Sequence, residues 1–239
     1  YNNENTAIFF IHGAGIGPLQ YKDFIFNSLP KNKKIFIMIL PNISNYIFSY
    51  NKIEKKAYIN FFDDIINNYD LEYFDIIGHC FGTIILSFIR DSFQTKIRNT
   101  YYIDPICFMN YSANICSYIF YKGDELIKYR NYINKTTKYN SQKFIYSLFI
   151  YFIFHDIYFQ KFIMRDIDGY DLWERCNNFD ESIYIILSGK DFLIPSKKLK
   201  TYFECYYENI NLFYFEDYRH GDFFLKKGCR DIQEKIFKF

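Results

Sequence analysis

Residues 76–83 read IIGHCFGT, an apolar run that breaks into two glycines with a cysteine between them. Cys80 is separated from Gly78 and from Gly82 by one residue each. The apolar run predicts the end of a buried strand, and the apolar residues 83–90 that follow predict a helix. A side chain at such a strand-to-helix turn is held above the carboxyl edge of a parallel sheet, where open α/β folds bind their ligands. The turn strains the backbone and crowds strand against helix, so glycines at these two positions relieve it.

A thiol at this turn would face the N-terminus of the following helix. Free N–H groups and partial positive charge are directed at that point, and both favour the thiolate form. The thiolate is the nucleophilic form of cysteine. The sequence therefore suggests that Cys80 attacks a carbonyl group.

Short apolar runs alternate with helical patterns along most of the chain. The runs predict strands at 7–11, 34–40, 74–77, 100–103, 182–187 and 210–215, and the patterns between them predict helices at 19–29, 55–69, 83–90, 196–207 and 222–239. One face of the helix at 55–69 carries the apolar residues Tyr58, Phe61, Phe62, Ile65, Ile66 and Tyr69. This alternation predicts the α/β class, with a mostly parallel twisted sheet covered by helices on both faces.

Residues 107–178 break that alternation, so we expect a core formed by 1–106 and 179–239 and a separate insertion between them. The insertion contains the most aromatic stretch of the chain, FIYSLFIYFIF at 144–154. That stretch is too short to span a bilayer, which requires about 20 apolar residues. We expect an internal helix of a subdomain, with a membrane-surface element as the alternative. His155, which follows it, is expected to be a satisfied helix histidine.

Composition and charge exclude several classes of protein. The formal net charge of +2 gives no basis for a nucleic-acid surface. The six cysteines are scattered, without the spacing of zinc sites or the density of a disulfide scaffold, which favours a reducing, intracellular compartment. No cluster at ligand spacing indicates a metal, and no feature indicates a cofactor. The first residue is Tyr1 and no signal peptide is visible, so we expect an excised domain whose targeting cannot be inferred.

Four motifs together resemble the α/β-hydrolase fold family. The G-x-C-x-G sequence, with Gly78 and Gly82 as supporting residues, resembles that family's nucleophile elbow, in which the central residue is normally serine. HGAGIG at 12–17 resembles its oxyanion loop, SGKDFLIP at 188–195 the segment that carries its acid, and YRHGDFF at 218–224 the loop that carries its histidine. The order nucleophile, acid, histidine is also that of the family. The chain would then begin at the family's third strand.

The resemblance implies a catalytic triad. Cys80 would be the nucleophile, His220 the general base, and Asp191 the carboxylate that fixes the tautomer of His220 and stabilises its charged form. Asp104 is the alternative acid, because some members of the family carry the acid after the strand that follows the elbow.

The resemblance also implies an oxyanion hole and its support. The backbone N–H groups of Ala14 and Phe81 would hold the oxyanion. His12 and Gly13 would support the loop, His12 through hydrogen bonds. His79 should point away from the nucleophile, with a role in packing or at the substrate's edge.

The activity implied is hydrolysis of an ester, thioester or lactone, through an acyl-thioester on the cysteine. Cysteine departs from the usual serine, although a minority of the family, such as the dienelactone hydrolases, use cysteine. The insertion occupies the place of a lid, and its aromatic residues would line a pocket for a lipophilic acyl group and allow peripheral membrane contact. Two alternatives stay open: an acyltransferase on the same scaffold, and a non-catalytic domain that binds a hydrophobic ligand or a protein partner.

Overall fold

The computed structural model describes residues 5–44, 54–108 and 182–237. Most of the predicted insertion lies outside these ranges, including 144–154 and His155, and so do the residues of the predicted lid. The described part contains six strands: β1 (Thr6–Ile11), β2 (Lys34–Met38), β3 (Tyr73–His79), β4 (Ile97–Ile103), β5 (Ser182–Ser188) and β6 (Ile210–Phe215). All six predicted strands are confirmed, although the second ends at Met38 rather than at residue 40.

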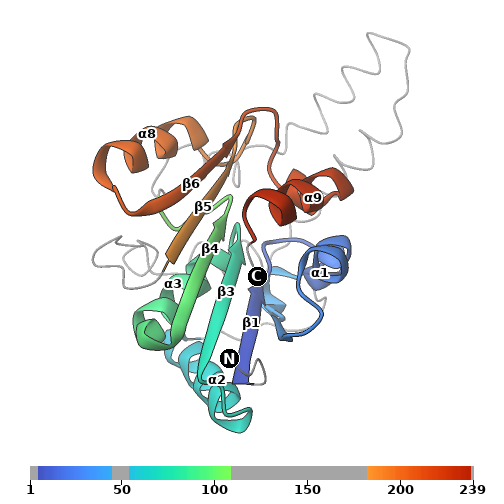
Figure 1. Ribbon diagram of the computed structural model, residues 1–239, viewed down its shortest axis with the longest axis vertical. Coiled ribbons are helices and arrows are strands. Elements are labelled where there is room, and N and C mark those ends of the chain that lie inside the picture. The colour runs from blue at the N-terminus through green and yellow to red at the C-terminus, as the bar shows by residue number, and fades with distance from the viewer. Residues whose placement is uncertain (1–4, 45–53, 109–181, 238–239) are drawn as a thin grey trace.

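The strands form one twisted sheet in the order β2-β1-β3-β4-β5-β6, and every neighbouring pair is parallel (Figure 1). The register aligns the carboxyl ends of the central strands, with Ile11 opposite Gly78 and His79 opposite Ile103. The predicted parallel sheet is therefore confirmed. Residues that follow β1, β3, β4 and β5 meet at one edge of the sheet.

Helices cover both faces of the sheet, as predicted. They are α1 (Lys22–Ser28), α2 (Lys55–Asn68), α3 (Gly82–Phe93), α8 (Ser196–Tyr206) and α9 (Lys226–Lys235), with 3-10 turns at Gly17–Tyr21, Pro41–Ile43, Gln94–Lys96 and Asp222–Phe224. Figure 1 shows α1 and α9 together on one side of the sheet and α2, α3 and α8 on the other. Two apolar cores result, because alternate residues of each strand point to opposite faces. Phe9 packs in the core with α2, α3 and α8, and Phe10 in the core with α1 and α9.

Three local predictions need correction. The apolar face of α2 is narrower than expected, because Phe61 and Tyr69 are 49% and 50% exposed while Tyr58, Phe62 and Ile66 are buried. Phe61 lies at the margin of the apolar stripe, and Tyr69 is exposed because it follows Asn68, the last residue of α2. The predicted helix at 19–29 is divided into a 3-10 turn and α1. The terminal helix is likewise divided, between Asp222–Phe224 and α9.

Four cysteines of the described residues are free thiols: Cys80, Cys107, Cys205 and Cys229.

Within the described ranges, every helix is too short or too polar to cross a bilayer.

Candidate active site

Cys80 occupies a sharp turn between β3 and α3. Its φ angle is +50°, a left-handed conformation that is uncommon for a residue with a side chain and that recurs at functional sites. The turn is fixed from both sides: the Cys80 amide donates to the Ile103 carbonyl at 3.1 Å, and the Cys80 carbonyl accepts from the Thr83 amide at 3.1 Å. Neighbouring β4 and the first turn of α3 thus hold the strained residue in place.

Close contacts around both glycines of the motif leave little room for a side chain. A Cβ atom at Gly82 would lie 2.2 Å from the Ile11 carbonyl oxygen at the end of β1. A Cβ atom at Gly78 would lie 2.9 Å from Leu86 Cδ1 and 3.2 Å from the Gly82 backbone. Any larger residue at Gly82 would push α3 away from the sheet, and Cys80 with it.

His220 and Asp191 lie together at the same edge of the sheet. His220 follows β6, and its Nδ1 atom is 2.7 Å from Asp191 Oδ2. The other carboxylate oxygen of Asp191 accepts from the backbone amides of Leu193 and Ile194, at 2.7 and 2.9 Å. The Asp191 side chain is fully buried and that of His220 is 12% exposed. The loop after β5 therefore presents one oxygen of a fixed carboxylate to the imidazole.

Cys80 is the other partner of His220. Burial opposes the charged imidazolium, but the charges of Asp191 and Cys80, and hydrogen bonds with both side chains, raise the pKa of His220 well above its ordinary value. Because Nδ1 faces Asp191, Nε2 is the nitrogen left for the sulfur. The structure thus brings together the three residues that the sequence places in a triad.

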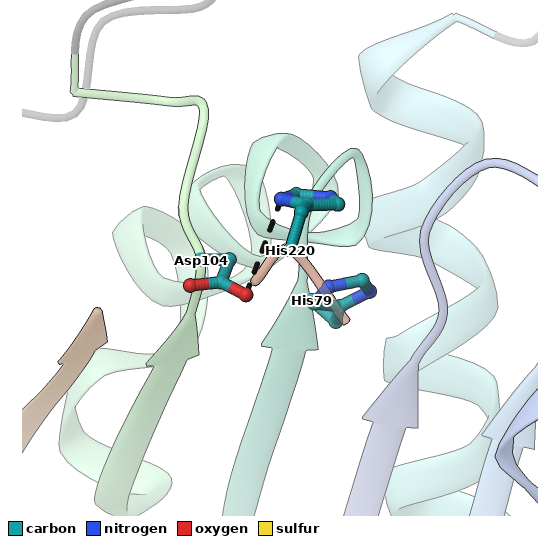
Figure 2. A group of neighbouring side chains, drawn as sticks. All are labelled: His79, Asp104 and His220. Carbon is teal, nitrogen blue, oxygen red and sulfur yellow. Dashed lines mark ion pairs between the residues drawn. The ribbon is translucent and has the colours of Figure 1, made fainter. Parts of the chain in front are cut away.

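Asp104, the alternative acid, reaches the same histidine. It follows β4 with a φ angle of +42°, it is fully buried, and its Oδ2 atom lies 4.0 Å from His220 Nδ1. Figure 2 shows this pair, with the Asp104 carboxylate directed at the His220 ring. Its oxygens accept from Ser188 N at 2.8 Å, Ser188 Oγ at 2.9 Å and Gly221 N at 3.2 Å.

The protonation of Asp104 is unusual. Burial and the nearby Asp191 charge raise its pKa to about 7, against the opposing effects of His220, Gly221 and Ser188. At neutral pH, Asp104 is therefore partly protonated, and it is held 4.0 Å from the imidazole that Asp191 contacts at 2.7 Å.

The glycine-rich loop after β1 touches the cysteine turn. A Cβ atom at Gly13 would lie 2.8 Å from Cys80 Cβ. The Gly15 amide donates to the Ile43 carbonyl at 3.0 Å and the Gly13 amide to Tyr21 Oη at 2.8 Å. The Ala14 amide between them donates to none of the residues that the structure describes. It is a candidate oxyanion donor together with the amide of Phe81, which follows Cys80.

Buried His12 supports this loop by hydrogen bonds. Its Nε2 atom accepts from the Leu40 amide at 3.0 Å, so the proton is on Nδ1, which donates to the Gly13 carbonyl at 2.7 Å. These contacts are those expected of a supporting residue rather than of a base.

His79 packs beneath the site and contacts a residue that the sequence did not indicate. It is buried, and its Nδ1 atom lies 2.8 Å from Tyr21 Oη. Its ring lies 5.0 Å from that of His220 and 4.6 Å from that of Phe224, between centroids. Tyr21 carries no sequence signal, because it is one of 25 tyrosines and lies outside every motif.

One nitrogen of His79, one of His220 and one carboxylate oxygen of Asp104 lie within 4.8 Å of one another. These three are the group of potential metal ligands in the part of the chain that the structure describes. Figure 2 shows them on three neighbouring segments of the sheet edge.

Comparison with known proteins supports the fold. No protein-family model and no curated sequence matches the chain. Solved structures do match, over almost its whole length. The 2-hydroxy-6-oxo-6-phenylhexa-2,4-dienoate hydrolase of a Rhodococcus strain has a TM-score of 0.67 at 12% identity, covering 96% of this chain and 89% of its own.

Two further structures agree. Naproxen esterase (carboxylesterase NP) from Bacillus subtilis has a TM-score of 0.60 at 12% identity, covering 98% of this chain and 82% of its own. An alpha/beta hydrolase enzyme from a Medee basin deep-sea metagenome library has a TM-score of 0.63 at 13% identity, covering 97% and 88%. At these identities the likeness concerns the fold, and the chain has the α/β-hydrolase fold.

Proposed function

We propose that this protein is a hydrolase that cleaves ester, thioester or lactone bonds with Cys80 as its nucleophile. The observation that carries the proposal is the arrangement at the sheet edge, where a strained cysteine contacts His220, whose other nitrogen is 2.7 Å from Asp191. The names of the similar structures, which describe an esterase and hydrolases, support the same reaction class.

In the first half of the reaction, the Cys80 sulfur attacks the carbonyl carbon of the substrate. The thiol proton passes to Nε2 of His220, and the carbonyl oxygen becomes an oxyanion facing the amides of Ala14 and Phe81. When the oxyanion collapses, the bond to the leaving alcohol or thiol breaks. His220 returns its proton to that leaving group, and the acyl group remains on Cys80 as a thioester.

In the second half, water attacks the thioester while His220 accepts one of its protons. Collapse of the second oxyanion breaks the bond between sulfur and carbon, and the proton returns to Cys80. Asp191 stabilises the imidazolium in both halves, in agreement with the raised pKa of His220. The products are a carboxylic acid and the free enzyme.

The preferred acyl group is proposed to be lipophilic, and the same insertion is proposed to allow peripheral membrane contact. Both rest on the aromatic sequence of 144–154, which lies outside the described residues. A series of p-nitrophenyl esters of increasing chain length tests the first point, because a lipophilic pocket predicts kcat/KM that rises with acyl length.

The decisive test compares Cys80→Ala with Cys205→Ala on these esters. We expect kcat to fall by roughly 10⁴-fold or more in Cys80→Ala, as when other triad nucleophiles are removed. Cys205 is an exposed free thiol on α8, so its substitution controls for a non-specific thiol reaction and should leave turnover unchanged. Mass spectrometry of acid-quenched enzyme should find the acyl group on Cys80. Unchanged turnover in Cys80→Ala would contradict the proposal.

A further inference from the structure

The hydrogen bonds around Tyr21 fix where its proton lies. Its oxygen accepts from the Gly13 amide at 2.8 Å and lies 2.8 Å from His79 Nδ1. Burial raises the pKa of Tyr21 more than any other effect, so the hydroxyl is neutral and keeps its proton. The Gly13 amide can only donate, so the hydroxyl proton is directed at the other neighbour of the oxygen, His79 Nδ1, at 2.8 Å.

The tautomer of His79 follows. Burial, followed by the charges of His220 and His12, lowers the pKa of His79 well below its ordinary value, so the ring is neutral. Because Nδ1 accepts from Tyr21, the single ring proton is on Nε2. This N–H group is buried and has no hydrogen-bond partner among the residues that the structure describes. A buried donor without an acceptor is costly, so this N–H should have one.

The carboxylate of Asp104 lies nearby as an acceptor. His79 lies beside Asp104 and His220, with potential ligand atoms of all three within 4.8 Å (Figure 2). That separation can be spanned by one bridging water or closed by a small movement. To bind a metal, His79 would need a free nitrogen lone pair, but Nδ1 accepts from Tyr21 and Nε2 carries the ring proton. The hydrogen-bond pattern therefore favours an acceptor over a cation.

We propose that His79 is a positioning residue that links the oxyanion loop to the catalytic histidine. Through Tyr21 it is bonded to the Gly13 amide, and through its Nε2–H it donates toward the Asp104 carboxylate beside His220. The catalytic consequence rests on the proposed function, whereas the tautomer and the hydrogen-bond chain do not.

The proposed hydrogen-bond chain predicts an effect of His79 on the pKa of Asp104. Three titratable groups face Asp104: Asp191 from the loop after β5, His220 from the loop after β6 and His79 from β3. The titratable groups that face His79 are Tyr21, His12 and His220. A donor favours the carboxylate form, so losing the His79 N–H should raise the pH at which Asp104 releases its proton.

Two variants of His79 separate its two nitrogens. His79→Asn keeps an acceptor near the place of Nδ1 and removes the Nε2–H, whereas His79→Gln keeps a donor near Nε2 and removes the acceptor for Tyr21. We expect the titration midpoint of Asp104, followed by carboxyl carbon NMR, to rise by about half a pH unit or more in His79→Asn and to change less in His79→Gln. The activity of His79→Asn at neutral pH should fall by about 5- to 10-fold in kcat with little change in KM.

Tyr21→Phe tests the other end of the chain. It leaves the Gly13 amide without its acceptor and frees His79 Nδ1, so kcat should fall by about 10-fold, while KM changes little. Tyr58→Phe, which removes another buried tyrosine hydroxyl on α2, is the matched control and should retain activity.

Nitrogen NMR of histidine-labelled protein gives the direct readout. We expect His79 to be neutral and protonated on Nε2, and to move toward a mixture of tautomers in Tyr21→Phe. A proton on Nδ1, or equal Asp104 midpoints in His79→Asn and His79→Gln, would overturn the proposal. These measurements need no substrate, so they remain informative if Cys80→Ala shows that the proposed function is wrong.

Discussion

Two carboxylates reach one nitrogen of His220 from adjacent strands, and they are held in different ways. Asp191 follows β5 and lies 2.7 Å from Nδ1, while Asp104 follows β4 and lies 4.0 Å from the same atom. One oxygen of Asp191 is occupied by two backbone amides and the other is left for the imidazole. Both oxygens of Asp104 are occupied by Ser188, and one also accepts from Gly221.

The two sets of contacts suit the two carboxylates to different tasks: one orients the imidazole of His220, and the other anchors the backbone beside it. Only the shorter distance is a hydrogen bond, so Asp191 is suited to orient the imidazole and to stabilise its charge. Asp104 holds the backbone next to His220 and joins it to the end of β5, and its buried charge is opposed by Asp191. Under the proposed function, Asp191 is therefore the triad acid and Asp104 a supporting residue, and the following variants test that division.

The largest effect is expected for Asp191→Asn. The amide keeps the shape of the side chain but removes the charge that stabilises the imidazolium, so kcat/KM should fall by roughly 10³- to 10⁴-fold in ester hydrolysis assays. Asp217→Asn changes an exposed carboxylate on the loop after β6 and should have no effect. The division of roles is wrong if Asp191→Asn remains more active than Asp104→Asn.

Asp104→Asn should have a smaller effect on the same assay. The variant loses the carboxylate charge 4.0 Å from Nδ1 and places an amide group against the donors of Ser188 and Gly221. We expect kcat/KM to fall by about 10- to 100-fold at pH 8, where wild-type Asp104 is mostly ionised. A loss equal to that of Asp191→Asn would mean that the two carboxylates act as one unit.

The pH dependence of stability gives a test that is independent of activity. Because the pKa of Asp104 is raised from 3.8 to about 7, the folded state keeps a proton that the unfolded state releases. The free energy of unfolding should therefore fall between pH 4 and 7, by at most about 1.4 kcal/mol per pH unit from this group, and level off above.

His220 acts in the same direction. Its raised pKa stabilises the folded state at low pH, and that contribution is lost as the pH rises through the folded pKa. Urea denaturation of Asp104→Asn across this range isolates the carboxylate: its curve should be flatter than that of wild type. Parallel curves would show that Asp104 titrates normally.

The sequence predicted most of the fold and named residues that the structure gathers at one sheet edge, but it did not show that Asp104 and Asp191 both lie beside His220. Each buried strand is a short apolar run, and Cys80, Asp191 and His220 stand in motifs whose order is informative by itself. The sequence offers Asp104 only as an alternative to Asp191, because it does not show that loops after neighbouring strands converge on one imidazole. Tyr21 had no signal at all, since its contacts with Gly13 and His79 depend on how a 3-10 turn packs against the sheet edge.

The smallest expected effect is that of removing the Ser188 hydroxyl, one of the hydrogen-bond donors to Asp104. Ser188→Ala removes the hydroxyl that donates to Asp104 Oδ2 at 2.9 Å but leaves the backbone amide that donates to Oδ1. The carboxylate loses one of its donors, so its pKa should rise further above about 7, and kcat/KM at neutral pH should fall by about 2- to 3-fold. Ser28→Ala removes a buried serine hydroxyl on α1 that donates to the Cys229 carbonyl at 3.2 Å, away from Asp104, and is the matched control. If Asp104 were instead the acid that orients His220, Ser188→Ala would lower kcat/KM by more than Asp191→Asn does, because the loss of its donor would loosen the carboxylate that holds the imidazole.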